Sequence, residues 1–170
     1  MGRPLAGAEV LIAGAGGAAH AVAYACLTAG AARVTVGSRS PDRAEALLAR
    51  LAAVGNGRRA ATGLDDAFLA AARSADVAVN ATTVGMIDPG MTIPVEELAD
   101  HATVFDLVYV PAETPLLEAA RARGLRASNG SEMLIAQAAI AFERWTGVGG
   151  MDDVMRAAVA PLLADASVRA

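Results

Sequence analysis

The chain has 170 residues and a formal net charge of −4; 55% of its residues are hydrophobic, 19% charged and 4% aromatic. This composition excludes intrinsic disorder, the single Cys26 excludes a disulfide scaffold, and an acidic balance without a basic run argues against nucleic-acid binding. The fourteen basic residues are all arginine, since the sequence contains no lysine.

Short apolar runs alternate along the chain with longer segments of helical spacing. The runs predict strands at residues 9–13, 33–38, 77–80 and 104–107, and the spacing predicts helices at 18–29, 42–53, 65–73, 115–123, 131–146 and 152–163. Strands that are apolar on both faces suit a parallel sheet covered by helices. We therefore expect an α/β, Rossmann-like, doubly wound and mainly parallel sheet of about six strands. Residues 1–170 are expected to form one domain.

Turn and capping residues agree with these boundaries. Gly30 and Gly124 follow predicted helices as C-terminal stops. Ser40 is placed to cap a helix whose first residue is Pro41, the position that proline favours.

Residues 10–32 contain no Asp, Glu or Arg, and an apolar run of that length is able to cross a bilayer. Gly14, Gly16 and Gly17 interrupt the run near its start, and His20 follows them. We expect a strand, a turn and a helix there instead of a membrane span, in a protein of the reducing cytoplasm.

The first predicted strand leads directly into the glycine-rich segment 14–19 and then into a helix. Glycines allow a tight turn and a close approach of backbone to a pyrophosphate, and Ala19 is small enough for the helix to pack on the strand. Free N–H groups at the helix start attract phosphates. A tight turn without a ligand is the alternative. The cofactor-binding residues expected here are Gly14, Ala15, Gly16, Gly17 and Ala18.

The end of the second predicted strand indicates which dinucleotide binds. An NAD site places Asp or Glu there for the ribose 2′-hydroxyl, but this sequence has Ser38, Arg39 and Ser40. Arg43 follows one helical turn later, and arginine matches phosphate oxygens. NADP is therefore favoured over NAD, unless both arginines are simply solvated surface charges.

Five ordered motifs resemble the C-terminal, cofactor-binding domain of shikimate dehydrogenases, which reduce 3-dehydroshikimate with NADPH, and of their quinate dehydrogenase relatives. Ser38-Arg39-Ser40 stands where the family often has Asn-Arg-Thr, and Val110 stands where Asn is common. The matching segments are 14–19, 38–40, 80–86 (Asn-Ala-Thr-Thr-Val-Gly-Met), 106–117 and 130–137, with Phe142 and 145–147 behind them.

The resemblance implies roles for residues that follow the later strands. Asn80 and Thr82 would line the cofactor near its ribose and nicotinamide, although Asn80 is also a common turn former. Backbone carbonyls at Val108 and Gly130 would approach the nicotinamide. The resemblance further places Met133 and Leu134 beside that ring, and Tyr109 and Gln137 near the substrate. Plain core roles for Met133 and Tyr109 are the alternatives.

Proton transfer is the part of the reaction that this sequence does not supply. In the family a lysine and an aspartate serve there, on a preceding substrate domain that we expect to be absent from this chain. No catalytic residue is therefore assigned, and the scattered His20, His101 and Cys26 form no metal site. The isolated chain is expected to bind NADP(H) without turnover. A separate substrate domain or a homodimer partner would complete the site, and a stand-alone NADP-binding module or sensor is the alternative.

Overall fold

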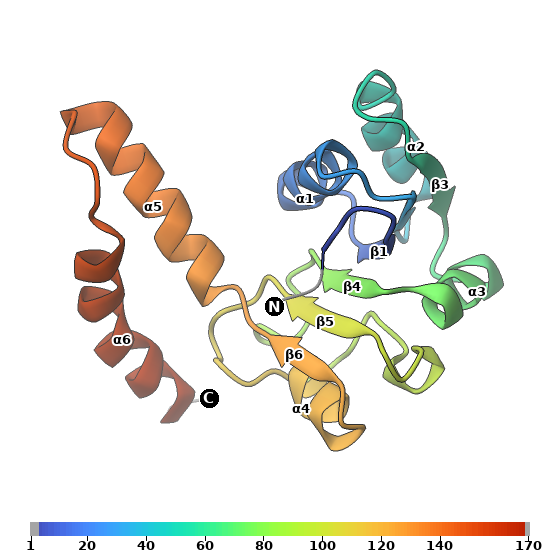
Figure 1. The fold of residues 1–170 in the computed structure, drawn as a ribbon. Coiled ribbons are helices and arrows are strands. Elements are labelled where there is room, and N and C mark those ends of the chain that lie inside the picture. Colours follow the sequence, from blue (N-terminus) through green and yellow to red (C-terminus); the bar gives the residue numbers. More distant parts are fainter. Residues whose placement is uncertain (1–3, 169–170) are drawn as a thin grey trace.

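A parallel sheet forms the centre of the protein, whose computed structural model describes residues 4–168 and side chains as far as residue 161 (Figure 1). The strand order is β3-β2-β1-β4-β5-β6, so the order reverses between β1 and β4. This is the Rossmann arrangement, and the predicted fold class is confirmed. The strands are β1 (Glu9–Ala13), β2 (Arg33–Gly37), β3 (Arg58–Thr62), β4 (Val77–Asn80), β5 (Thr103–Asp106) and β6 (Arg126–Ser128).

Helices cover both faces of this sheet because its central strands are apolar on both sides. Val10 and Ile12 of β1 pack in one core with residues of α1 and α2, whereas Leu11 and Ala13 pack in a second core with α3, η1 and α4. The alternation follows from the two-residue period of a strand. The helices are α1 (Gly17–Thr28), α2 (Pro41–Arg50), α3 (Asp66–Ser74), the 3₁₀ helix η1 (Val95–Glu97), α4 (Pro115–Ala122), α5 (Ser131–Thr146) and α6 (Asp152–Val168).

Most predicted boundaries agree with the structure to within a few residues. Strands 9–13 and 77–80 and helix 131–146 are as predicted, β2 ends one residue earlier than expected, and β5 is shifted by one residue. Gly30 and Gly124 both adopt positive φ after their helices, as C-terminal stops do. Ser40 and Pro41 begin α2 as expected, without a hydrogen bond from the serine side chain.

The apolar run 10–32 folds as β1, a turn and α1 rather than as one long helix. Among the described helices none combines the length and the apolar character needed to cross a membrane.

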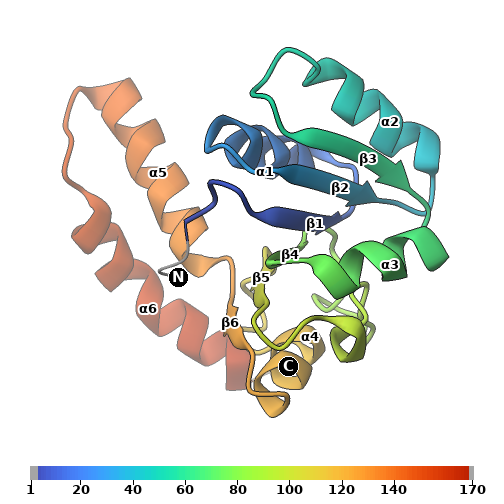
Figure 2. The same cartoon turned by 45° about the vertical axis from the view of Figure 1, so that its right-hand side comes forward.

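The last two helices form a hairpin at one end of the sheet. α5 leaves β6, and α6 returns beside it, so that the pair stands to one side of the other helices in both views (Figures 1 and 2). Several large apolar side chains of this hairpin are exposed: Ile140 at 57%, Trp145 at 83%, Val148 at 51% and Val154 at 58%.

Candidate functional site

The glycine turn lies at the carboxyl edge of the sheet, where the strand order reverses between β1 and β4. Gly14 follows β1 with φ +108°, and a Cβ there would lie 2.8 Å from the carbonyl oxygen of Ala81. Only glycine fits both constraints. Ala19 is fully buried where α1 packs on the sheet, as the sequence predicts. Open α/β sheets bind ligands at such a reversal point.

A polar pocket of about 490 Å³ opens beside this turn and is lined by the predicted phosphate-binding residues. Within the described residues, the guanidinium groups of Arg39 and Arg43 have no hydrogen-bond or ion-pair partner. Asp88 is the one acidic residue among those that line the pocket, so the two guanidinium groups outnumber it. The predicted residues here are Gly14, Ala15, Gly16, Ser38, Arg39, Ser40, Arg43 and Thr82, which also lines the apolar pocket described below.

A second pocket of about 460 Å³ continues from the first into the groove between α1 and α2. Gly16 and Arg43 contribute to it, together with Gly17, His20 and Arg50. The start of α1 therefore faces open space with basic side chains around it, which favours an anionic ligand.

An apolar pocket of about 280 Å³ lies on the other side of the turn. It is built from the start of α1, the segments after β4 and β5, and the first turns of α5. Gln137 lines it one helical turn after Met133, as the spacing predicts. Its predicted lining residues are Ala18, Thr82, Val108, Tyr109, Gly130, Met133, Leu134 and Gln137.

The backbone at Val108 and Gly130 holds two walls of this pocket close together. Gly130 N donates to the Val108 carbonyl at 3.1 Å, and the Gly130 carbonyl accepts from Leu134 N at 3.0 Å. A Cβ on Gly130 would lie 2.2 Å from the carbonyl oxygen of Leu107, so the contact requires glycine. Each of the two carbonyls accepts one hydrogen bond within the chain, and each has a second lone pair.

Asn80 lies behind the site instead of lining it, unlike the other predicted residues. The side chain is buried, with 1% exposure, and lines none of the three pockets. Its Nδ2 donates to Asp106 Oδ1 at 2.8 Å and to the Val84 carbonyl at 3.1 Å. Its Oδ1 accepts from Thr82 N and Oγ1 and from Thr92 Oγ1. The turn-forming alternative therefore describes its position.

Nine residues that line these two pockets were not predicted as site residues. The polar pocket adds Gly37, Leu64, Val84, Asp88 and Thr92, the apolar pocket adds Met86 and Leu107, and both pockets share Ala81 and Thr83. Thr83 follows a predicted strand and Leu107 ends one, and these places close to predicted residues were a usable signal. Leu64, Asp88 and Thr92 come together through loop conformations that carry no periodic pattern.

Within the residues that the structure describes, no three His, Cys, Asp or Glu side chains are grouped to hold a metal ion. His101 Nε2 lies 3.2 Å from Asp76 Oδ1. Cys26 is buried in the core, and burial raises the pKa of its thiol to about 11.

Comparison with known proteins gives a consistent result over the chain. The family described as Shikimate / quinate 5-dehydrogenase matches residues 2–87, and the Shikimate 5'-dehydrogenase C-terminal domain matches residues 130–160. A shikimate dehydrogenase (NADP(+)) of Azorhizobium caulinodans is 45% identical over 139 residues, which are 81% of this chain and 48% of the relative.

Two solved structures share the fold. Shikimate 5-dehydrogenase of Listeria monocytogenes, in complex with shikimate and NAD, has a TM-score of 0.84 at 28% identity, covering 93% of this chain and 57% of that one. The Thermus thermophilus enzyme, in complex with NADP(H) and shikimate, has a TM-score of 0.78 at 38% identity, covering 94% and 57%. The chain thus spans about half the length of the relatives that it matches.

Proposed function

Because the chain belongs to the shikimate/quinate dehydrogenase family, we propose that it is the NADP(H)-binding domain of an oxidoreductase that interconverts 3-dehydroshikimate and shikimate. The observation that carries the proposal is the pair of pockets on either side of the glycine turn, one polar with two arginines and one apolar. NADP(H) matches this division, because its adenosine half carries the charged 2′-phosphate and its other half ends in the nicotinamide ring. The proposed pyrophosphate position is the start of α1.

The adenosine end is proposed to occupy the polar pocket, with its 2′-phosphate near Arg39 and Arg43. The lack of partners for these two guanidinium groups within the described residues supports this assignment. A charged group without a counter-ion favours a phosphate, and arginine offers a planar pair of donors to it. Ser38 and Ser40 line the same pocket and add hydroxyl groups.

The nicotinamide end is proposed to lie in the apolar pocket. Val108 and Gly130 would offer their carbonyls to its amide, and Met133 and Leu134 would pack against the ring. The bound cofactor would supply or accept the hydride. Tyr109 and Gln137, which line the same pocket, are the proposed substrate contacts.

These 170 residues are proposed to bind the cofactor without completing the reaction. Reduction of a ketone needs a proton donor beside the hydride donor, and the family's lysine has no counterpart in a chain that contains no lysine. The exposed Trp145, Ile140, Val148 and Val154 support a partner for the α5–α6 hairpin, either a substrate domain or a second copy of the chain.

The test combines cofactor binding with turnover. The chain is titrated into NADPH, whose fluorescence reports binding, and shikimate is then added with NADP⁺ while NADPH absorbance is followed. The proposal expects binding and no NADPH formation. Failure to bind NADPH contradicts the cofactor assignment, and turnover by these residues alone contradicts the missing proton-transfer group. Binding without shikimate oxidation after a family substrate domain is added would favour a stand-alone module or sensor.

A further inference from the structure

A fully buried carboxylate lies at the edge of the apolar pocket. Asp106 is the last residue of β5, has no exposed surface, and directly precedes Leu107 and Val108, which line the pocket. Its Oδ1 accepts from Asn80 Nδ2 at 2.8 Å and from Val108 N at 3.0 Å, and its Oδ2 accepts from Thr114 Oγ1 at 2.6 Å. Three donors from three places in the chain therefore converge on one side chain.

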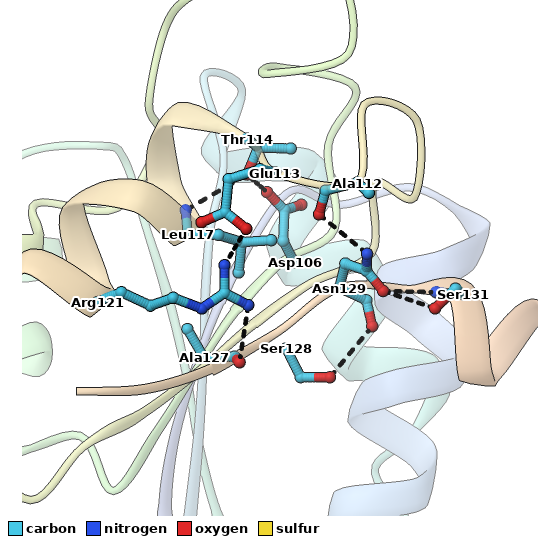
Figure 3. A network of polar contacts seen from close by, with 10 residues as sticks. All are labelled: Asp106, Ala112, Glu113, Thr114, Leu117, Arg121, Ala127, Ser128, Asn129 and Ser131. Atoms are coloured by element: carbon cyan, nitrogen blue, oxygen red, sulfur yellow. Dashed lines mark hydrogen bonds and ion pairs between the residues drawn. The ribbon is translucent and has the colours of Figure 1, made fainter. Parts of the chain in front are cut away.

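The carboxylate fixes both ends of the segment 107–114. Val108 N donates to the carboxylate near the start of the segment. Thr114 Oγ1 donates to it at the end, where Thr114 also caps α4 (Figure 3). Between these anchors Asn129 Nδ2 donates to the Ala112 carbonyl at 2.9 Å (Figure 3). Tyr109 lies within this segment, so its backbone position depends on the anchors.

Asn80 connects the same carboxylate to the segment 81–92. Thr82 and Thr92 donate to Asn80 Oδ1, and Asn80 Nδ2 also donates to the Val84 carbonyl. This segment contributes Thr82, Thr83 and Met86 to the apolar pocket. Two parts of the pocket wall are thus joined through one Asn–Asp pair.

Apart from the Asn80–Asp106 bond, which joins the ends of β4 and β5, the network serves the segments that follow these strands. Backbone bonding already joins β4 to β5 at this edge, where Leu107 N donates to the Asn80 carbonyl at 2.9 Å. Apart from Asn80, every hydrogen-bond partner described for the Asp106 side chain belongs to the segment 107–114. A carboxylate removed from water costs free energy unless hydrogen bonds compensate it. Here two of the three bonds, from Val108 and Thr114, act directly on a segment that walls the pocket.

We propose that Asp106 is a positioning residue whose carboxylate holds segments 81–92 and 107–114 at the separation that admits the nicotinamide half of the cofactor. The proposal rests on the proposed function, which assigns the nicotinamide to the apolar pocket. The adenosine half depends much less on the Thr114 anchor, because no residue of segment 107–114 lines the polar pocket, whereas segment 81–92 contributes Asp88 and Thr92 to it. Asp106 touches neither half and acts through the two segments.

The test compares two ligands that share the adenosine half. NADP⁺ carries the nicotinamide, and 2′-phospho-ADP-ribose lacks it. Thr114→Val removes the anchor at the end of segment 107–114, whereas Thr114→Ser retains the hydroxyl. Thr114→Val also removes a helix cap, so Asp65→Ala, which removes the side-chain cap of α3, is the matched control for lost stability. Asp106→Ala removes all three anchors.

We expect Thr114→Val to weaken NADP⁺ binding by about fivefold or more and Asp106→Ala by about tenfold or more, because buried hydrogen-bonding groups are left unpaired, the Asp106 carboxylate in the first variant and its three donors in the second, and the segments relax. Binding of 2′-phospho-ADP-ribose to Thr114→Val should stay within about twofold of the wild type, and Thr114→Ser and Asp65→Ala should leave the ratio of the two affinities unchanged. If Asp106→Ala does not fold, the comparison of Thr114→Val with Thr114→Ser tests the proposal.

Parallel losses for both ligands in folded Thr114→Val, or no loss for either, would overturn the positioning role. A wild-type chain that binds neither ligand would instead refute the proposed function, so the two failures are distinguishable.

Discussion

Asn80 and Asp106 occupy the last paired positions of β4 and β5, and 2.8 Å separates Nδ2 of Asn80 from Oδ1 of Asp106. The pair is buried, and its remaining hydrogen bonds go to the segments that follow both strands. Parallel neighbours that each end in a polar residue thereby organise the ligand edge of the sheet.

Asn80→Asp should destabilise the fold strongly near neutral pH. Two carboxylates would face each other at hydrogen-bond distance without water, and the Val84 carbonyl would lose its donor. We expect the free energy of unfolding to fall by about 3 kcal/mol, with part of this loss recovered at acidic pH where the pair shares a proton. Urea unfolding at neutral and at acidic pH measures this change in the free energy of unfolding. The exchange Asn80→Asp with Asp106→Asn should recover part of the loss, and an equally unstable double variant would contradict this reasoning.

The stability of the wild type should depend on pH through Asp106. Burial is the largest influence on this carboxyl and raises its pKa, while hydrogen bonds from Thr114, Val108 and Asn80 partly oppose the rise. The folded state then retains the proton to higher pH than the unfolded state does. Its contribution to stability is therefore present below the ordinary aspartate pKa of about 4 and is lost as pH rises through the higher folded value.

Comparison with Asp106→Asn isolates this contribution. The difference in unfolding free energy, wild type minus variant, should decrease as pH rises from about 4, by about 1.4 kcal/mol for each unit by which folding raises the pKa. A difference that is constant with pH, or that increases, would show that the carboxyl titrates normally or below its usual range.

Two glycines of the turn should respond differently to alanine. Gly14→Ala meets the Ala81 carbonyl at 2.8 Å and requires positive φ, so a loss of about 2–4 kcal/mol in stability is expected. Gly16→Ala meets nothing within 4 Å and should change stability by about 1 kcal/mol or less. Its methyl group should nevertheless weaken NADP⁺ binding about tenfold or more, because it projects where a pyrophosphate approaches. Thermal unfolding and calorimetric titration separate the two effects, and unchanged affinity in Gly16→Ala would argue against the pyrophosphate position.

The two arginines of the polar pocket should govern cofactor choice. Arg39→Ala and Arg43→Ala are each expected to weaken NADP⁺ about tenfold, because a charge-assisted contact to phosphate is lost, and to leave NAD⁺ binding unchanged. Arg144→Ala on α5 is the matched control, since the Arg144 guanidinium also has no partner within the described residues and Arg144 lines none of the three pockets. Equal losses for both cofactors would assign the arginines a role other than phosphate recognition.

The sequence predicted the fold class because its central strands are continuous apolar runs between helices. It did not locate β3, whose Arg58 and Arg59 interrupt any apolar pattern, or β6, which has only three residues. Both lie at the edges of the sheet, where one side lacks a neighbouring strand and the demand for apolar residues is weaker.

The candidate site was predictable where motif and strand end coincide, as at Gly14 and Arg39. The direction in which a buried amide points is not encoded in a motif, so Asn80 was expected to line the cofactor and instead bonds Asp106. A clue was nonetheless present: both residues lie at or next to the ends of predicted parallel strands, which places them near one another at the sheet edge. Asp88 reached the polar pocket only through the path of its loop.

Calorimetric titration of the unmodified chain with NADP⁺ and with NAD⁺ under the same conditions tests the cofactor assignment most directly. Because Arg39 and Arg43 are proposed to recognise the 2′-phosphate, the chain should bind one equivalent of NADP⁺ with an affinity at least about tenfold higher than for NAD⁺. Equal affinities for the two cofactors, or no binding of NADP⁺, would contradict this assignment.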